Sequence, residues 1–330
     1  MKKKKVILSY DYELFFGDRS GTVQKSLIEP TNQLLDAMES VGFKGNFFID
    51  WQMLKYLSLE KDDRCKLDNA AIVSQLKDMV RRGHRIELHI HPHWVDAKYN
   101  GDGTWNFDEF RHYSLNSFTK DEITEMFVEG TNLLESIARE IEPNYKIIAF
   151  RAGGWAVQPF DILAEGFIKA GIKIDSSVMP GLHSELENSY FDFRNAPLSQ
   201  LGYYHFDMDV VTEKKTGQFL EVPISSTKHK MVNRFINFFY RILGDTYECY
   251  TDGSHFRRQE GGHSSYTNSM IPYTISSIKP FNQLFYIARS KQELVCYIDH
   301  PKDYSNYTIN GIHAISKLTE SITYKDLIYV

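Results

Sequence analysis

The chain has 330 residues, of which 42% are hydrophobic and 14% aromatic, and its formal net charge is −5 at pH 7. A chain of this length can bury a large core and fits either one α/β barrel or two ordinary domains. The acidic balance gives no reason to expect nucleic acid as a partner, because nucleic-acid-binding surfaces are basic. The three cysteines lack metal-ligand spacing, and we expect reduced thiols at Cys65, Cys249 and Cys296.

The N-terminal segment resembles the start of a signal peptide only in its charge. Lys2 to Lys5 form a basic run, but Ser9, Asp11 and Glu13 interrupt the apolar stretch that should follow it. The remaining sequence has no run of 18 apolar residues, the length that a transmembrane helix needs. We therefore expect a soluble, cytoplasmic protein without a transmembrane segment.

Strand-like and helix-like patterns alternate along the chain. Thr119 and Glu122 form a capping box that predicts the start of a long helix, and Gly42, Gly83 and Gly171 mark the ends of three other helices. Alternation of this kind predicts about seven βα units and a parallel sheet with helices outside it. The predicted strands are residues 6–10, 45–49, 86–90, 146–150, 172–176, 219–224 and 294–298, and the predicted helices are residues 30–40, 70–82, 119–139 and 160–170.

Polar residues follow several of these strands, and their distribution indicates the type of sheet. A barrel assembles its active site from the carboxyl ends of many strands, whereas an open doubly wound sheet concentrates it at one crevice. We predict one domain over residues 1–330, an α/β fold built as a distorted seven-stranded (β/α) barrel similar to a TIM barrel. The residues at the strand ends are Asp11, Glu13, the histidines near residue 90, Arg151, Asp175 and His300.

Residues 181–280 depart from the alternation and are rich in aromatic side chains. We predict an insertion whose loops cover the catalytic face and whose aromatic side chains stack on sugar rings, with core packing as the alternative and the favoured one for any single aromatic. Within it, residues 231–243 read as an amphipathic helix, which either packs on the barrel, the favoured interpretation, or makes weak membrane contact. Its apolar positions are Phe235, Ile236, Phe239 and Ile242.

Four histidines, His84, His89, His91 and His93, lie within ten residues, and Pro92 ends the strand that carries them. In an extended segment His89 and His93 would lie roughly 13 Å apart, at about 3.3 Å per residue. A turn at Pro92 would bring them to one ion that binds His nitrogens at about 2.0–2.1 Å. We predict His89 and His93 as metal ligands, and interpret His84 and His91 as ordinary surface or core histidines.

Five segments appear in the order of the motifs of a known family. They resemble those of the polysaccharide deacetylases, carbohydrate esterase family 4, which share the NodB-homology fold. Each segment alone is weakly specific, but together they span most of the chain, from residue 6 to about residue 301. The segments are SYDYE at residues 9–13, HIHPH at 89–93, RAGGW at 151–155, DSS at 175–177 and YIDHP at 297–301.

The resemblance implies hydrolysis of an N-acetyl group, with one residue to activate water and another to protonate the leaving amine. It places the base at Asp11 and the acid at His300. It further implies that Arg151 orients Asp11 and that Asp175 tunes His300. The alternative for Arg151 is a structural salt bridge, and Asp175, taken alone, is more often a helix or turn cap.

The resemblance also implies one divalent metal ion on two histidines and a carboxylate, which leaves open positions for chemistry. We expect zinc, with cobalt, iron, nickel and manganese as alternatives. The family's first motif usually has adjacent aspartates, but the second position here is Tyr12. Glu13 is therefore the expected third ligand beside His89 and His93, and a structural carboxylate paired with a cation is the alternative.

The third motif also departs from the family, which usually has a tyrosine where this chain has Gly154. This suggests a differently shaped or wider end of the site for the acyl group. Backbone N–H groups near Gly153 and Gly154 are expected to bind the oxyanion, since glycine permits close approach. Trp155 and Trp94 are expected at the substrate, with simple core packing as the alternative.

These expectations describe a metal-dependent hydrolase that removes an N-acetyl group from an amino sugar or glycan precursor in bacterial surface-polysaccharide biosynthesis. One alternative is a metal-free C–N hydrolase of the same fold, such as its allantoinase-like members, which Tyr12 would suit. Another is a non-catalytic barrel that binds glycans. Metal analysis of the purified protein separates both alternatives from the main interpretation.

Overall fold

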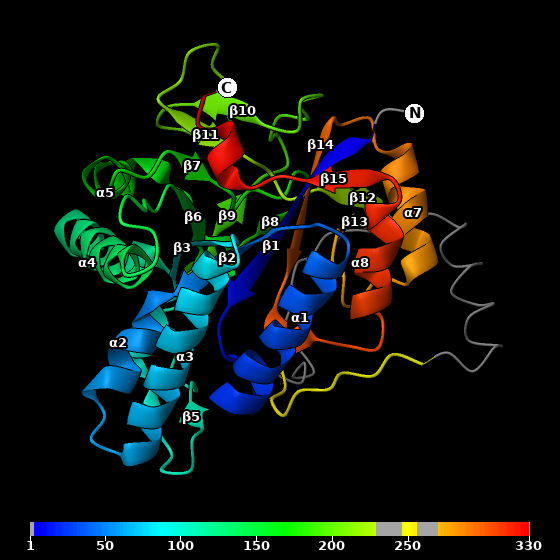
Figure 1. Cartoon of the computed structure of the whole chain (residues 1–330). Helices are drawn as coiled ribbons and strands as arrows, with labels where there is room; N and C mark the ends of the chain where they lie inside the picture. The colour runs from blue at the N-terminus through cyan, green and yellow to red at the C-terminus, as the bar shows by residue number, and fades with distance from the viewer. Residues whose placement is uncertain (1–2, 229–245, 256–269, 330) are drawn as a thin grey trace.

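The computed structural model describes residues 3–228, 246–255 and 270–329. Its main element is a sheet that curls through the centre of the molecule, with helices arranged around its outside (Figure 1). The predicted amphipathic segment with Phe235, Ile236, Phe239 and Ile242 lies outside the described residues.

The central sheet has nine strands among the described residues, in the order β10-β11-β7-β6-β3-β2-β1-β14, with β15 paired to β1. Neighbours from β11 to β14 run parallel, and only β10 pairs antiparallel. The strands are β1 (Lys4–Tyr12), β2 (Gly45–Asp50), β3 (Arg85–Ile90), β6 (Ala149–Ala152), β7 (Ile174–Asp175), β10 (Tyr204–Phe206), β11 (Phe219–Glu221), β14 (Leu294–Asp299) and β15 (Thr319–Ser321).

Strands β2, β3 and β14 are buried along their whole length, as strands covered on both faces are. The predicted α/β class is therefore confirmed. Among the described residues, the sheet is not closed into a full barrel by a ladder. Ser225 bridges the gap to β14, because its N–H donates to Cys296 O at 2.9 Å and its hydroxyl accepts from Cys296 N at 3.0 Å.

The helices follow the expected alternation. The capping box of Thr119 and Glu122 is present, and the long helix ends at Arg139 as predicted. Gly171 ends its helix in the left-handed conformation, with φ of 75°. The helices are α1 (Glu29–Ser40), α2 (Trp51–Leu59), α3 (Asp63–Arg81), α4 (Lys120–Arg139), α5 (Ala164–Ala170), α7 (Pro280–Arg289) and α8 (Thr308–Ser316).

Residues 181–280 contribute to the sheet as well as to loops, since β10 and β11 belong to this region. Among the described residues, three two-stranded sheets lie outside the main sheet, and two of them come from the same region. They are β4 (Lys98–Tyr99) with β5 (Trp105–Asn106), β8 (His183–Ser184) with β9 (Phe191–Asp192), and β12 (Ser226–Lys228) with β13 (Met270–Pro272).

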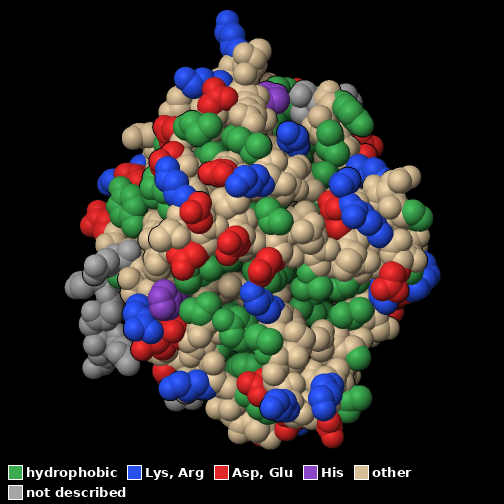
Figure 2. Space-filling view, turned by 90° about the vertical axis from the view of Figure 1, so that its left-hand side faces the viewer, with side chains coloured by type: hydrophobic (Ala, Val, Ile, Leu, Met, Phe, Trp, Pro, Cys, Tyr) green, Lys and Arg blue, Asp and Glu red, His purple; other side chains and the backbone are tan. Residues whose placement is uncertain are grey.

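The face turned to the viewer in Figure 2 carries acidic and basic side chains intermixed with apolar ones. This pattern agrees with a modest net charge of −5. No helix among the described residues combines the length and apolar character needed to cross a bilayer.

Candidate active site

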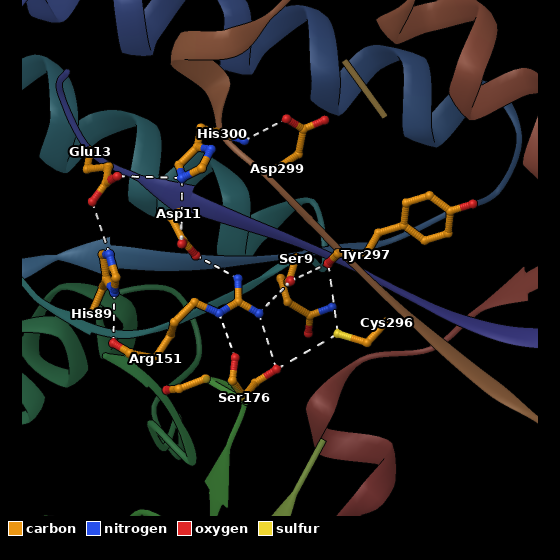
Figure 3. A network of polar contacts seen from close by, with 12 residues as sticks. Ser9, Asp11, Glu13, His89, Arg151, Ser176, Cys296, Tyr297, Asp299 and His300 are labelled. Atoms are coloured by element: carbon orange, nitrogen blue, oxygen red, sulfur yellow. Dashed lines mark hydrogen bonds and ion pairs between the residues drawn. The ribbon is translucent and has the colours of Figure 1, made fainter. Parts of the chain in front are cut away.

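The polar residues at the strand ends meet at one edge of the sheet. Asp11 lies on β1 and His89 on β3, and their strands are joined through β2. Proline follows both β3 and β14, at Pro92 and Pro301, and turns the chain away from the sheet at this edge. His300 sits directly before Pro301 and points back toward Asp11 (Figure 3).

Arg151 is fully buried and fixes Asp11. Its Nη1 donates to Asp11 Oδ1 at 2.7 Å, while its Nη2 donates to Ser9 Oγ at 2.8 Å. Its Nε donates to Ser176 O at 2.8 Å, and the guanidinium lies 4.4 Å from the centre of the Phe48 ring. One oxygen of Asp11 is thereby held, and the other, Oδ2, lies 3.7 Å from His300 Nε2 (Figure 3).

Glu13 brings two imidazoles to one carboxylate oxygen. Its Oε2 lies 3.0 Å from His89 Nε2 and 2.7 Å from His91 Nε2. The other nitrogen of His89, Nδ1, lies 2.7 Å from Arg151 O, so Nδ1–H is the donor there, and Nε2–H of the protonated ring donates to Glu13 Oε2. All three side chains are buried.

Charge and burial set the protonation of this cluster. Burial opposes the charged form of His89, but the carboxylates of Asp11 and Glu13 raise the pKa of His89 to about 9. Burial lowers the pKa of His91 to about 4. Burial also opposes ionisation of Glu13, yet His91, Lys302 and His89 hold the pKa of Glu13 well below its usual range. Glu13 is therefore ionised at neutral pH.

Lys302 is a buried cation that the sequence did not single out. Its Nζ donates to Glu13 Oε1 at 2.7 Å and to Leu14 O at 2.9 Å. The ammonium also lies 5.5 Å from the centre of the Phe15 ring and 5.1 Å from that of Phe16. Lys302 thus holds one oxygen of Glu13 and leaves the other to the two histidines.

The donor set of Glu13, His89 and His91 fits a divalent ion. One ligand atom from each residue lies within 4.8 Å of the others. Ligands bound at about 2.0–2.1 Å around a tetrahedral ion are roughly 3.3 Å apart, close to the separations seen here. The hydrogen bond from His89 Nδ1 to the backbone carbonyl of Arg151 is of the kind that commonly orients metal-bound histidines. The ion would displace the proton of His89 when it binds.

The structure does not bring His93 to Glu13, although His93 was the predicted second histidine ligand. His93 lies in the turn Pro92–Asp96 and is buried, with its ring centre 5.0 Å from that of His91. His91, which was interpreted as an ordinary histidine, occupies the expected position instead. The strand periodicity of the sequence could have predicted this position for His91, because His89 and His91 are two residues apart and such residues face the same side of a strand. His84 is a structural residue, as interpreted, since its Nδ1 accepts from Gly45 N.

His300 is held by Asp303 rather than by Asp175. Its Nδ1 lies 3.0 Å from Asp303 Oδ2, and Asp303 Oδ1 lies 2.8 Å from His255 Nε2. Burial opposes the charged form of His300, but the bond to Asp303 raises the pKa of His300. Asp303 is three residues after His300 in a 3₁₀ turn, in which side chains at i and i+3 eclipse. The three-residue spacing of His300 and Asp303 could therefore have predicted this contact from the sequence.

Asp175 lies away from His300 and pairs with another carboxyl group. Its Oδ1 accepts from Ser177 Oγ at 2.8 Å, and it shares a hydrogen bond with Glu221 on the neighbouring strand. Burial raises the pKa of both carboxyl groups. Neighbouring buried carboxylates resist simultaneous ionisation, and the charge of Asp175 adds to the effect of burial on the pKa of Glu221. Asp175 therefore joins β7 to β11, and the structure does not place it beside the acid.

The predicted oxyanion segment follows β6. Gly154 and Trp155 both adopt left-handed backbone conformations, with φ of 60° and 61°. This conformation is strained for Trp155, and such strain concentrates at functional sites. Trp155 lines the cavity at the site, whereas Trp94 is fully buried and donates from Nε1 to Asp50 Oδ2 at 2.5 Å. Trp94 is a core residue here.

These groups open into a cavity of about 660 Å³. Its volume is in the range of sites for small ligands. Asp11, Glu13, His91 and His300 lie in its wall, and aromatic rings and polar side chains form much of the remainder. The other lining residues are Phe16, Phe110, Tyr113, Gly154, Trp155, His183, Ser184, Leu186, Asn188, Ser189, Phe191, His255 and Lys302.

No family model and no curated protein matches this chain. Solved structures similar to it include 4-α-glucanotransferase from Thermococcus litoralis, with 12% identity and a TM-score of 0.51. That match covers 100% of this chain and 40% of the glucanotransferase chain, so the chain spans less than half of that protein. The likeness shows a shared fold, and fold alone does not determine activity.

Solved structures of lower similarity include polysaccharide deacetylases and family 4 carbohydrate esterases. A putative polysaccharide deacetylase from Mycobacterium smegmatis has 13% identity and a TM-score of 0.43, covering 96% of this chain and 83% of that chain. A family 4 carbohydrate esterase from Streptomyces lividans, in complex with acetate, has 9% identity and a TM-score of 0.39. The match covers 96% of this chain and 87% of the esterase chain.

Proposed function

We propose that the chain is a metal-dependent hydrolase that removes the N-acetyl group of an amino sugar. One observation carries the proposal: Glu13, His89 and His91 present three ligand atoms beside Asp11 and His300, at the carboxyl ends of the strands. Two imidazoles and a carboxylate are a donor set that zinc accepts with positions left open. Such an ion polarises a carbonyl and lowers the pKa of bound water.

Asp11 is the proposed base that removes a proton from the attacking water. Arg151 holds Asp11 Oδ1, so the free Oδ2 has a fixed direction toward the cavity. Fixing the base in this way removes the need to reorient it during the reaction. Arg151 is thus a positioning residue with four polar contacts of its own.

His300 is the proposed acid that protonates the leaving amine. It lies 3.7 Å from Asp11 Oδ2 through Nε2, so the base and the acid face the same part of the cavity. The contact with Asp303 fixes its ring and favours the protonated form that an acid needs. Backbone N–H groups of Gly153 and Gly154 remain the proposed oxyanion donors.

The cavity supports an amino sugar as the substrate. Aromatic rings such as Phe110 and Trp155 suit the apolar faces of sugar rings, and Ser184 and Asn188 suit their hydroxyl groups. The last two residues belong to the region 181–280, which supports the proposal that this region contributes to substrate choice. A precursor of a bacterial surface polysaccharide is the proposed natural substrate.

The test is a panel of nucleotide-linked, lipid-linked and free N-acetylhexosamines, assayed for both acetate and free amine. We expect equal amounts of the two products from at least one member. Asp11→Asn is the inactive control. Equal acetate release by wild type and this variant would indicate a contaminating deacetylase. No release from any member by the metal-loaded protein would contradict the proposal.

A metal-free C–N hydrolase is a second candidate, and Lys302 favours it. Its ammonium already balances the charge of Glu13, and Arg151 balances that of Asp11. The cluster therefore has no uncompensated carboxylate that demands a cation. Activity of the chelated protein equal to that of the metal-loaded protein would select this candidate.

A further inference from the structure

The ring of Tyr113 fills the space beside Gly154. A Cβ atom at Gly154 would lie 2.7 Å from Tyr113 Cε1 and 2.9 Å from Tyr113 Oη, which is closer than real Cβ contacts allow. The sequence suggested a wider acyl end because Gly154 has no side chain. Tyr113, from a different loop, occupies that space instead.

Stacking fixes the position of this ring. Tyr113 and His93 lie nearly parallel, with ring centres 5.6 Å apart and an interplanar angle of 16°. His93 in turn meets the Phe16 ring edge-on at 4.1 Å and the Phe107 ring at 5.4 Å. His93 therefore acts as a buried platform, and the Tyr113 ring rests on packed core residues.

Tyr113 also lies beside the groups proposed for chemistry. Its ring centre is 6.4 Å from that of His91, and it lines the same cavity as Asp11 and Trp155. An amide whose carbonyl oxygen is bound by the backbone N–H groups at Gly153 and Gly154 would have its acyl chain close to Tyr113, because this ring lies against Gly154. The Tyr113 ring therefore forms a wall that limits the space available for the acyl chain.

We propose that Tyr113 determines the size of the acyl group that the site accepts, an inference that rests on the proposed N-deacetylase function. The ring admits a methyl group and excludes longer chains by contact. Discrimination of one methylene in an apolar pocket is typically about 10–200-fold, so removal of this wall has a measurable effect.

The test compares kcat/KM for the N-acetyl, N-propionyl and N-butyryl forms of the most active substrate of the panel, measured by release of the free amine. Tyr113→Ala is expected to raise the butyryl-to-acetyl ratio by about tenfold or more. Tyr113→Leu, which leaves less empty space, is the second variant if the alanine protein does not fold, and should raise the ratio less. The wild-type protein is expected to prefer the acetyl substrate.

Two controls isolate the wall. Tyr113→Phe keeps the ring and should leave the ratio within about twofold of the wild-type value. Tyr190→Ala removes an exposed ring near the β8–β9 hairpin but outside the cavity, and should also leave the ratio unchanged. An unchanged ratio in both Tyr113→Ala and Tyr113→Leu, with active wild-type protein, would overturn the inference. Wild-type protein that releases acetate from no member of the panel would overturn the proposed function itself, and this inference with it.

Discussion

Arg151 reaches Asp11 across the interior of the sheet, with Nη1 at 2.7 Å from Oδ1, although the two residues are 140 positions apart in the sequence. The arginine has no exposed surface, and its other hydrogen bonds are to Ser9 and Ser176. A buried ion pair of this kind gives Asp11 a fixed orientation at the cavity wall. Removal of either partner leaves the other charge buried and unpaired.

Asp11→Asn should lower kcat/KM by on the order of 10²–10⁴-fold, since the amide cannot accept the proton from water. The metal content of the variant should equal that of the wild-type protein, because Asp11 is not in the donor set of Glu13, His89 and His91. Steady-state kinetics and elemental analysis of the same samples measure both quantities. Loss of metal from Asp11→Asn would make Asp11 a ligand.

His91→Ala and His93→Phe should differ in metal content. His91 Nε2 lies at Glu13 Oε2, so its removal takes one of three ligands away and should leave well under one ion per chain after dialysis. His93→Phe keeps a flat ring at the stacked position and should retain about one ion per chain. Inductively coupled plasma mass spectrometry gives the stoichiometry. The reverse pattern would restore the ligand assignment predicted from sequence.

Asp303→Asn should lower the catalytic rate more than Asp175→Asn does. Asp303 touches His300, whereas Asp175 bonds to Ser177 and Glu221. Loss of an orienting carboxylate beside a catalytic histidine costs on the order of 10²–10⁴-fold. We expect less than tenfold for Asp175→Asn after correction for the folded fraction. A larger loss in Asp175→Asn would return the tuning role to Asp175.

Glu221→Gln should change how stability depends on pH. Burial raises the pKa of Glu221 in the folded protein above its value in the unfolded chain, about 4.3. The folded state then binds more protons, so stability falls as the pH rises through the window between the two pKa values. Glutamine lacks this titration, and the melting temperature of the variant should fall less than that of the wild type between pH 5 and pH 8.

The exposed variant Glu125→Gln on α4 provides the matched control, and its melting curve should track the wild type. We expect the gap between Glu221→Gln and wild type to widen on the order of a few degrees toward alkaline pH. If the melting temperatures of Glu221→Gln and wild type change in parallel between pH 5 and pH 8, the carboxyl pair does not change its protonation on unfolding and the prediction is wrong.

The sequence predicted those parts of the fold that local patterns determine. Buried strands such as β3 appear as apolar runs, and the capping box at Thr119 sets the start of α4 within one residue. The gap in the barrel could not be predicted from the sequence, because the hydrogen bonds between Ser225 and Cys296 that bridge it join positions 71 residues apart. Such pairing depends on tertiary packing, for which a single sequence gives no signal.

The sequence predicted which strand ends meet but not every side-chain contact there, and the roles of these residues stay predictions. Asp11, Glu13, His89, Arg151 and His300 meet as expected from their places at strand ends. The turn at Pro92 carries His93 into the core rather than toward Glu13, because its ring packs against aromatic side chains contributed by distant loops. The role of Lys302 depends on the meeting of two chain segments 289 residues apart.

The measurement that tests the central claim most directly is acetate release by chelated protein during titration with one divalent ion, with the most active substrate of the panel. The account predicts negligible activity of the chelated wild-type protein and full recovery near one equivalent of ion. Glu13→Gln should require a large excess of ion, because the carboxylate that joins His89 and His91 is lost. Full activity of the chelated protein, or recovery that is unchanged in Glu13→Gln, would contradict the account.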